Sequence, residues 1–155
     1  MVTPPDAGGV PIAASLRPVR VEDLAVFFAH QDDPVAHRMA DFPARDYGAF
    51  MAHWTKILAD PSVTCRTVLV DGDVAGNVMT FDFEGRREVG YWIGRAYWGR
   101  GIATHAVAAL LDLDPTRPLY AGVAADNAGS IRVLQKCGFV RYGKDDGHII
   151  LVRLG

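Results

Sequence analysis

Apolar side chains recur at spacings of three and four in several stretches of this chain, which is typical of helices with one buried face. The clearest such stripe runs through residues 102–113. The first helical stretch opens at acidic residues near position 22, and Pro34 is expected to interrupt it. The pattern predicts helices that begin at residue 21, span about 45–58, span 102–113 and begin near residue 127.

Alternation of apolar and polar residues marks the strands. It is strict at residues 80–84, where two phenylalanines alternate with three polar residues. Glycine-containing turns at residues 71–73 and 85–87 separate neighbouring strands, which predicts a meander. A strand at residues 16–20 is expected at a sheet edge, because Pro18 has no N–H to donate. The full set of predicted strands is 16–20, 67–70, 74–83, 88–94, 119–125, 139–142 and 148–154.

These elements predict an α+β fold. Their order, β-α-α-β-β-β-α-β-α-β-β, favours one central mixed, mostly antiparallel β-sheet flanked by helices. The 155 residues suit one compact domain, which we assign to residues 16–155. Residues 1–15 are rich in Pro, Gly and Ala, and we interpret them as a flexible tail. The aromatic residues of the first two helices are expected in the core: Phe27, Phe28, Phe50 and Trp54.

Composition narrows the class of protein. The formal net charge is -2 and no basic stripe is interleaved with aromatic residues, so we expect no nucleic-acid partner. No apolar run reaches the roughly 20 residues of a membrane helix, and the first residues do not resemble a secretory signal. Cys65 and Cys137 form no disulfide framework, and His30, His37 and His53 lack the spacing of zinc ligands. We therefore expect a cytoplasmic protein without a membrane partner or a metal.

The segment of residues 98–104, between a predicted strand and a predicted helix, carries the clearest candidate chemistry. Gly99 and Gly101 would let the backbone approach an anion, and the N–H groups of the helix start would bind it. Arg100 adds positive charge and Thr104 adds a hydroxyl. The segment is neither a Walker loop nor a dinucleotide fingerprint. On these residues alone, a phosphate site and a plain strand-to-helix loop both stay open.

Residues 127–139 form a second candidate segment. Asn127 and Ser130 suit the start of a helix, and a glycine follows at its expected end. Together the two segments resemble the paired motifs of the GNAT N-acetyltransferases. Residues 98–103 resemble the Q/R-x-x-G-x-G/A motif, and residues 127–139 resemble N-x-x-S/A-x(7)-G-F. The resemblance covers residues 16–154, and it is most similar to the branch of the ribosomal-protein N-terminal acetyltransferases and their small-molecule relatives.

The resemblance implies a GNAT-like fold and an enzyme that transfers acetyl from acetyl-CoA to a primary amine, by direct attack in a ternary complex. Backbone N–H groups near residues 91–93 would polarise the thioester carbonyl. The resemblance leaves two acceptors open, a protein N-terminus and a small-molecule amine, and it leaves open a monomer or a homodimer. It implies contacts with acetyl-CoA at eight positions: Trp92, Ile93, Arg100, Gly101, Ala103, Thr104, Asn127 and Ser130.

The implied reaction needs a proton acceptor, because an amine with a lysine-like pKa of about 10.4 is mostly protonated near neutral pH. Glu88 stands at the head of a predicted strand and matches a position that often supplies the catalytic base in this family. The other interpretation is a surface carboxylate beside Arg86 and Arg87. Asp82 and Glu84, on the adjacent strand, are weaker candidates for the base.

Two positions depart from the family pattern. Leu134 stands where the family often has a tyrosine general acid, and His105 stands where this branch commonly has glutamate. The missing tyrosine keeps a second class of function open, a non-catalytic acyl-CoA-binding module that serves as a sensor or scaffold. His37, Arg38 and Asp41 fall in the region that walls the acceptor site in this family, so they are candidates for contact with the acceptor.

Overall fold

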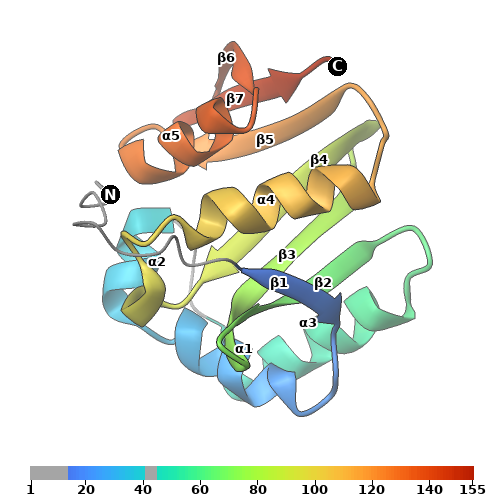
Figure 1. Ribbon diagram of the computed structural model, residues 1–155, viewed down its shortest axis with the longest axis vertical. Helices are drawn as coiled ribbons and strands as arrows, with labels where there is room; N and C mark the ends of the chain where they lie inside the picture. Colours follow the sequence, from blue (N-terminus) through green and yellow to red (C-terminus); the bar gives the residue numbers. More distant parts are fainter. Residues whose placement is uncertain (1–13, 41–44) are drawn as a thin grey trace.

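The computed structural model describes residues 14–40 and 45–155, which form one mixed sheet with helices on both faces (Figure 1). The strand order is β1-β2-β3-β4-β5-β7-β6. The strands are β1 (Ser15–Pro18), β2 (Thr64–Val70), β3 (Asp73–Phe83), β4 (Arg86–Ile93), β5 (Leu119–Ala124), β6 (Val140–Asp145) and β7 (His148–Arg153). The helices are α1 (Asp23–Gln31), α2 (Pro34–Ala40), α3 (Tyr47–Ala59), α4 (Ile102–Leu113) and α5 (Ala128–Lys136), with a 3-10 turn η1 (Arg95–Tyr97).

The predicted α+β fold is confirmed, and the structure corrects details of it. Three helices precede β2 instead of two, β2 begins at Thr64 and not at residue 67, and β6 extends to Asp145 and not to residue 142. Pro34 does not simply interrupt a helix: it is the first residue of α2, where its missing N–H costs nothing. The second turn of the meander lies at Glu84 and Gly85, so β4 begins at Arg86 and is longer than predicted. The tail predicted for residues 1–15 lies mostly outside the described residues, although Ser15 belongs to β1.

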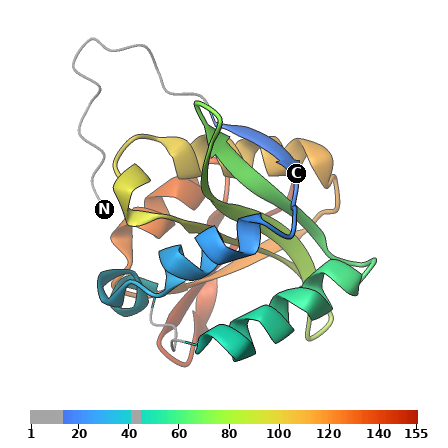
Figure 2. The ribbon, with the colours of Figure 1, turned by 90° about the horizontal axis from the view of Figure 1, so that it is seen from below.

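Helices lie on both faces of the sheet (Figure 2), and a hydrophobic cluster lies between the sheet and the helices on each face. The larger one packs α4 and α5 against the sheet, and Ile102, Ala106 and Leu110 of α4 are each at most 1% exposed. The smaller one lies under α1 and α3 and contains Phe27, Phe50 and Trp54, as the sequence predicts. No helix in residues 14–40 or 45–155 is long and apolar enough to cross a membrane.

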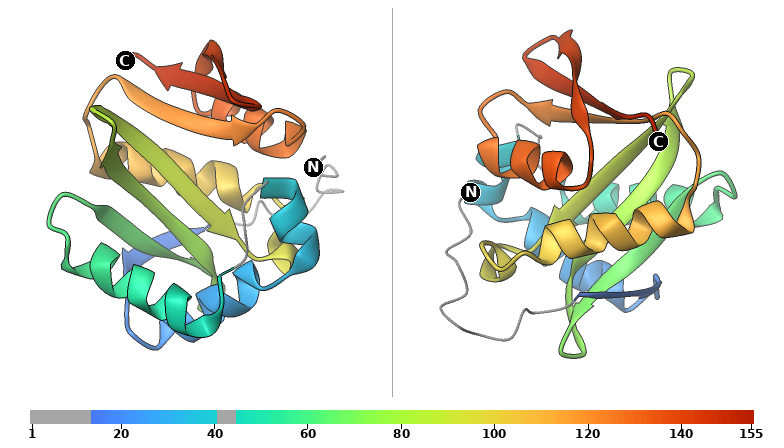
Figure 3. Two further views of the ribbon diagram at one scale, coloured as in Figure 1. Left: turned by 180° about the vertical axis from the view of Figure 1, so that it is seen from behind. Right: turned by 45° about the horizontal axis from the view of Figure 1, so that its top comes forward.

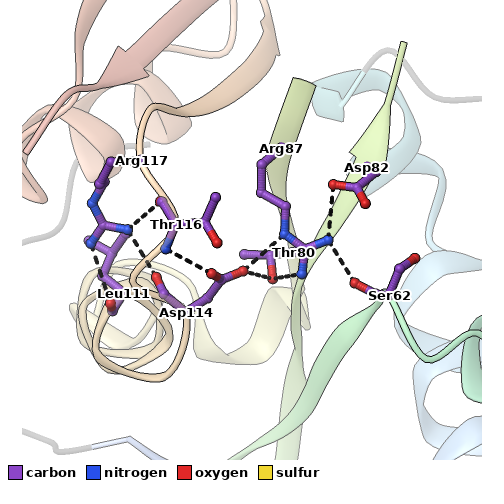
Figure 4. A network of polar contacts seen from close by, with 8 residues as sticks. All are labelled: Ser62, Thr80, Asp82, Arg87, Leu111, Asp114, Thr116 and Arg117. Carbon is purple, nitrogen blue, oxygen red and sulfur yellow. Dashed lines mark hydrogen bonds and ion pairs between the residues drawn. The ribbon is translucent and has the colours of Figure 1, made fainter. Parts of the chain in front are cut away.

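A buried polar network ties the end of α4 to the meander (Figure 4). Asp114 accepts hydrogen bonds from Thr80 (2.6 Å) and from the Arg87 guanidinium (3.0 Å). Burial alone would raise the pKa of Asp114, but the hydrogen bonds from Thr80, Thr116 and Arg87 outweigh it and hold that pKa well below its usual range. Arg87 also donates to Asp82 and to the carbonyl of Ser62, so one guanidinium connects α4, β3 and the start of β2.

The strands β4 and β5 diverge, and this divergence positions the site. They run parallel and pair at a single position, Glu88 with Tyr120, in the part of the chain that the structure describes. The other neighbouring strands pair antiparallel over several residues. Figure 3 shows β4 and β5 side by side at one end and apart at the other, where α5 follows β5. The sheet therefore opens into a gap beside the carboxyl end of β4.

Candidate active site

Peptide groups of β4 face the gap. The N–H of Gly94 donates to the carbonyl of Ala75 on β3 at 2.8 Å. Because the peptide groups of an antiparallel strand alternate in direction, those of Tyr91 and Ile93 point away from β3 and toward β5. The carbonyl of Ile93 accepts a hydrogen bond from Trp98 Nε1 at 2.8 Å. The end of β4 thus presents backbone N–H groups to the gap, as an extended polar ligand requires.

The turn before α4 is shaped for close approach of an anion. Gly99 and Gly101 both have left-handed backbones, with φ of 75° and 74°, which residues with a Cβ rarely adopt. Gly101 is the N-cap of α4, and within the described chain no side chain caps this helix start. A Cβ built at Gly101 would meet nothing within 4 Å, so the space beside it is open. The N–H groups of the first turn and the helix dipole favour an anion there.

A cavity of about 140 Å³ connects this helix start with the gap. Arg100 is the one residue of the predicted cofactor set that does not line it. The Arg100 guanidinium lies 5.7 Å from the centroid of the Tyr97 ring. The structure brings the other seven predicted cofactor residues together around the cavity: Trp92, Ile93, Gly101, Ala103, Thr104, Asn127 and Ser130. They come from β4, α4 and α5, which are far apart in sequence.

A second cavity, of about 370 Å³, meets the first one at the gap. It reaches from α1 and α3 to β5 and α5, and it includes Glu88 of β4 and Leu134 of α5. The residues that line both cavities are Ala40, Tyr91, Trp92, Asn127 and Ser130. Two ligands in these cavities would therefore meet beside the end of β4.

Glu88 is the carboxylate of the second cavity. Its Oε2 lies 3.6 Å from Nη2 of Arg86, and its side chain is 13% exposed. Burial raises the pKa of Glu88 above its ordinary value, and Arg86 opposes that rise. The two other carboxylates predicted as bases, Asp82 and Glu84, do not line this cavity. Asp82 instead pairs with Arg87, which turns toward Asp114 on the other face of the sheet.

Comparison with known proteins identifies the family to which the chain belongs. The chain matches the model of the acetyltransferase (GNAT) domain family over residues 14–140. The chain belongs to this family. The superfamily predicted from the two motifs is thereby confirmed.

Two curated relatives match a shorter part of this GNAT domain. The uncharacterized N-acetyltransferase p20 of Bacillus licheniformis is 38% identical over 63 residues, which cover 38% of this chain and 35% of the relative. The probable N-acetyltransferase YjcK of Bacillus subtilis (strain 168) is 39% identical over 59 residues, which cover 36% and 33%. The chain thus matches about a third of each relative's length.

Solved structures share the GNAT fold over nearly the whole chain. The aminoglycoside acetyltransferase AAC(6')-Ib in complex with coenzyme A has a TM-score of 0.77 at 21% identity, covering 92% of this chain and 95% of that one. An acetyltransferase from Agrobacterium tumefaciens str. C58 has a TM-score of 0.79 at 16% identity, covering 95% and 96%. These likenesses confirm the predicted fold, whereas the narrower branch of ribosomal-protein acetyltransferases stays a prediction.

The remaining predicted positions of the GNAT domain differ in their surroundings. His105 is exposed on α4, as expected of a solvated helix residue. Leu134 is fully buried and lines the second cavity. His37 and Arg38 lie on α2, and neither lines the two cavities described above. Asp41 lies outside the described residues.

Several residues of the site were not predicted from the sequence. Tyr91 lines both cavities, donates to the carbonyl of Ser130 at 3.4 Å, and has its pKa raised to about 12 by burial. His53 and His148 line the second cavity from α3 and β7. Burial lowers the pKa of His53, with help from Arg45 and Lys56. Tyr91 lies on the same strand as the predicted site residues Glu88 and Ile93, so it could have been predicted from its position. No sequence motif links His53 of α3 or His148 of β7 to this site.

Proposed function

We propose that this GNAT domain transfers an acetyl group from acetyl-CoA to a primary amine, by direct attack of the amine in a ternary complex. The observation that carries the proposal is the meeting of the two cavities beside β4. One of them begins at a helix start suited to a pyrophosphate, and the other contains a partly buried carboxylate. Solved relatives in complex with coenzyme A and kanamycin support the same pairing of ligands, at the level of the fold.

In this proposal the chain holds acetyl-CoA along the gap. The pyrophosphate lies at the start of α4, against Gly101, Ala103 and Thr104, and Arg100 adds positive charge at the rim. The pantetheine arm follows the end of β4 at Trp92 and Ile93, and Asn127 and Ser130 close its other side. The left-handed Gly101, with open space where a Cβ would stand, fits such a phosphate contact.

The chemistry follows from the same arrangement. Glu88 lies four residues before Trp92 on β4, roughly 13 Å along the strand, so it takes the proton of the ammonium through water. The neutral nitrogen attacks the thioester carbonyl, whose oxygen is polarised by the peptide N–H groups of Tyr91 and Ile93. The C–N bond forms and the C–S bond breaks, and the sulfur leaves as the thiolate. The nitrogen then loses its second proton, which the departing thiolate or water accepts, to give the neutral amide. A thiol pKa of about 8.5 makes that thiolate a stable leaving group, so Leu134 in place of tyrosine is compatible with turnover.

The proposal also concerns the identity of the acceptor, the cellular compartment and the oligomeric state. A protein N-terminus would agree with the resemblance to the ribosomal-protein branch, and a small amine would agree with the aminoglycoside named in the solved relatives. The proposed setting is the cytoplasm, with a monomer or a homodimer as the working form. Both cysteines are free thiols, which is consistent with a reducing compartment.

The decisive experiment measures release of free coenzyme A from acetyl-CoA with a panel of primary amines. The expected result is thiol release that depends on an amine, together with an acetylated amine in the mass spectrum. A reaction without amine corrects for hydrolysis. Calorimetric binding of acetyl-CoA without turnover of any amine would contradict the enzyme and support the acyl-CoA-binding sensor or scaffold.

A further inference from the structure

Six Phe, Tyr or Trp side chains are among the described residues that line the second cavity. Phe27 of α1 and Trp54 of α3 lie with ring centroids 5.0 Å apart, and Phe50 joins them at 6.4 Å from Trp54. Phe81 of β3 and Trp92 of β4 line the cavity from the sheet. Phe27, Phe50 and Trp54 are at most 4% exposed, so the partly exposed Phe81 and Trp92 offer the apolar surface from which a ligand would release water. Release of that water is the main source of binding free energy for small apolar ligands.

The charged groups of the cavity are few and of mixed sign. Among its described lining residues, Glu88 is the single carboxylate, whereas Arg45, His53 and His148 are basic or neutral. Within the described residues, the ion pair of Glu88 is the 3.6 Å contact with Arg86, which leaves its carboxylate able to bind one ammonium group. A second or third ammonium of a polyamine would find no further carboxylate among the described lining residues, and burying an unpaired charge is costly.

We propose that the acceptor is a small primary monoamine with an aromatic or bulky apolar body, and not a polyamine or an aminoglycoside. This inference rests on the proposed acetyl transfer and specifies its acceptor. The ammonium lies toward Glu88 and the gap, and the apolar body packs against Phe81 and Trp92. The volume of about 370 Å³ lies within the range of small-molecule sites.

The chain offers a matched set of variants to test this. Phe81 stands directly opposite Glu88 on the β3–β4 ladder, so their Cβ atoms are about 5 Å apart. Phe81→Asp adds a second carboxylate beside Glu88, and Phe81→Ser removes the ring without adding charge. Phe83→Ser, two residues along the same strand, changes a side chain that is 51% exposed and does not line the cavity, so it controls for the substitution itself.

The experiment compares kcat/KM for 2-phenylethylamine, putrescine, kanamycin and a tripeptide with a free N-terminus. For the unaltered protein we expect 2-phenylethylamine to be preferred by about tenfold or more over the other three. Phe81→Ser should lose about tenfold with 2-phenylethylamine, Phe81→Asp should shift preference toward putrescine, and Phe83→Ser should match the unaltered protein. Melting temperatures show whether each variant is folded.

The outcomes separate this inference from the proposed function. Preference for putrescine or kanamycin would overturn the monoamine assignment while leaving acetyl transfer intact, and preference for the tripeptide would indicate a protein N-terminus instead. If no amine is turned over, calorimetry of 2-phenylethylamine in the presence of coenzyme A decides. Binding that Phe81→Asp weakens would support the apolar site without the enzyme, and absence of binding would overturn it.

Discussion

Glu88 has the surroundings of a base that works near neutral pH. Burial raises its pKa, and the deprotonated form is the one that accepts a proton, so activity should fall as pH drops through a value above that of an ordinary glutamate. We expect Glu88→Gln to lower kcat by about 10²-fold, with acetyl-CoA binding unchanged and the acidic limb of the pH–rate profile lost. Asp82→Asn, outside the cavity, is the control. Turnover by Glu88→Gln within a few fold of normal would assign the base elsewhere.

Substitution of Gly101 can distinguish the cost of backbone strain from the loss of contact with the ligand. Its φ of 74° disfavours any residue with a Cβ, but Gly72 in the β2–β3 turn has a φ of 82°, and both positions open onto empty space. Gly101→Ala and Gly72→Ala should therefore cost similar stability, on the order of 1 kcal/mol. Only Gly101→Ala should weaken acetyl-CoA binding, as measured by calorimetry. Equal affinity in the two variants would show that the ligand does not approach this glycine.

The residues of the site were predictable where they belong to continuous motifs. Gly101, Ala103 and Thr104 follow one another on the turn into α4, so a local pattern carries them. Arg100 shares that pattern but stacks near Tyr97, because the direction of a long side chain depends on its neighbours in space. His53 joins the site through packing of α3 against the sheet, and no local pattern encodes that contact.

At the scale of elements, the start of α5 combines two roles, because Asn127 caps the helix and is also proposed to contact acetyl-CoA. Asn127 Oδ1 accepts from the N–H of Ser130 at 3.2 Å, and Asp46 Oδ1 caps α3 in the same way at 2.8 Å. Alanine at either position should cost about 0.5–2 kcal/mol of unfolding free energy. Asn127→Ala should in addition raise the KM for acetyl-CoA, and Asp46→Ala should not. A destabilised Asn127→Ala with normal kinetics would make Asn127 a cap alone.

Helix α2 shows why one element was missed. A proline after a helical stretch indicates an interruption, and the same residue is well tolerated at the first position of a new helix. The side chain of Asp33 accepts from the N–H of Val35 at 3.0 Å, which supports that new start. The long helices and the meander were predictable because their periodic patterns extend over many residues, whereas α2 has only seven.

The network around Arg87 acts on the whole molecule, because it joins α4 to the meander. The low pKa of Asp114 means that its ionised form stabilises the fold above about pH 4, and that this contribution is lost as pH falls below the ordinary value of 3.8. We expect Asp114→Asn to cost about 3 kcal/mol at pH 7, since it breaks a buried ion pair. The difference from the unaltered protein should shrink in acid, as measured by denaturant unfolding at several pH values.

Asp82→Asn is the matched control for this network, because Asp82 pairs with the same guanidinium but is 64% exposed. An exposed pair contributes about 0–1 kcal/mol, so this variant should be nearly as stable as the unaltered protein. Equal losses for the two variants, or a loss in Asp114→Asn that does not depend on pH, would show that the charge of Asp114 does not stabilise the fold.

Among the described residues β4 and β5 pair at a single position, so the peptide groups at the end of β4 have no neighbouring strand to bind. An extended pantetheine arm at Tyr91 and Ile93 would take the place of such a strand, so those two amides should exchange with deuterium more slowly when acetyl-CoA is bound. A ligand present at 100 times its Kd adds about 2.7 kcal/mol to the free energy of unfolding. The two parts of the sheet would then be held together most firmly when the cosubstrate is abundant, so the lifetime of the folded protein would report the supply of acetyl groups.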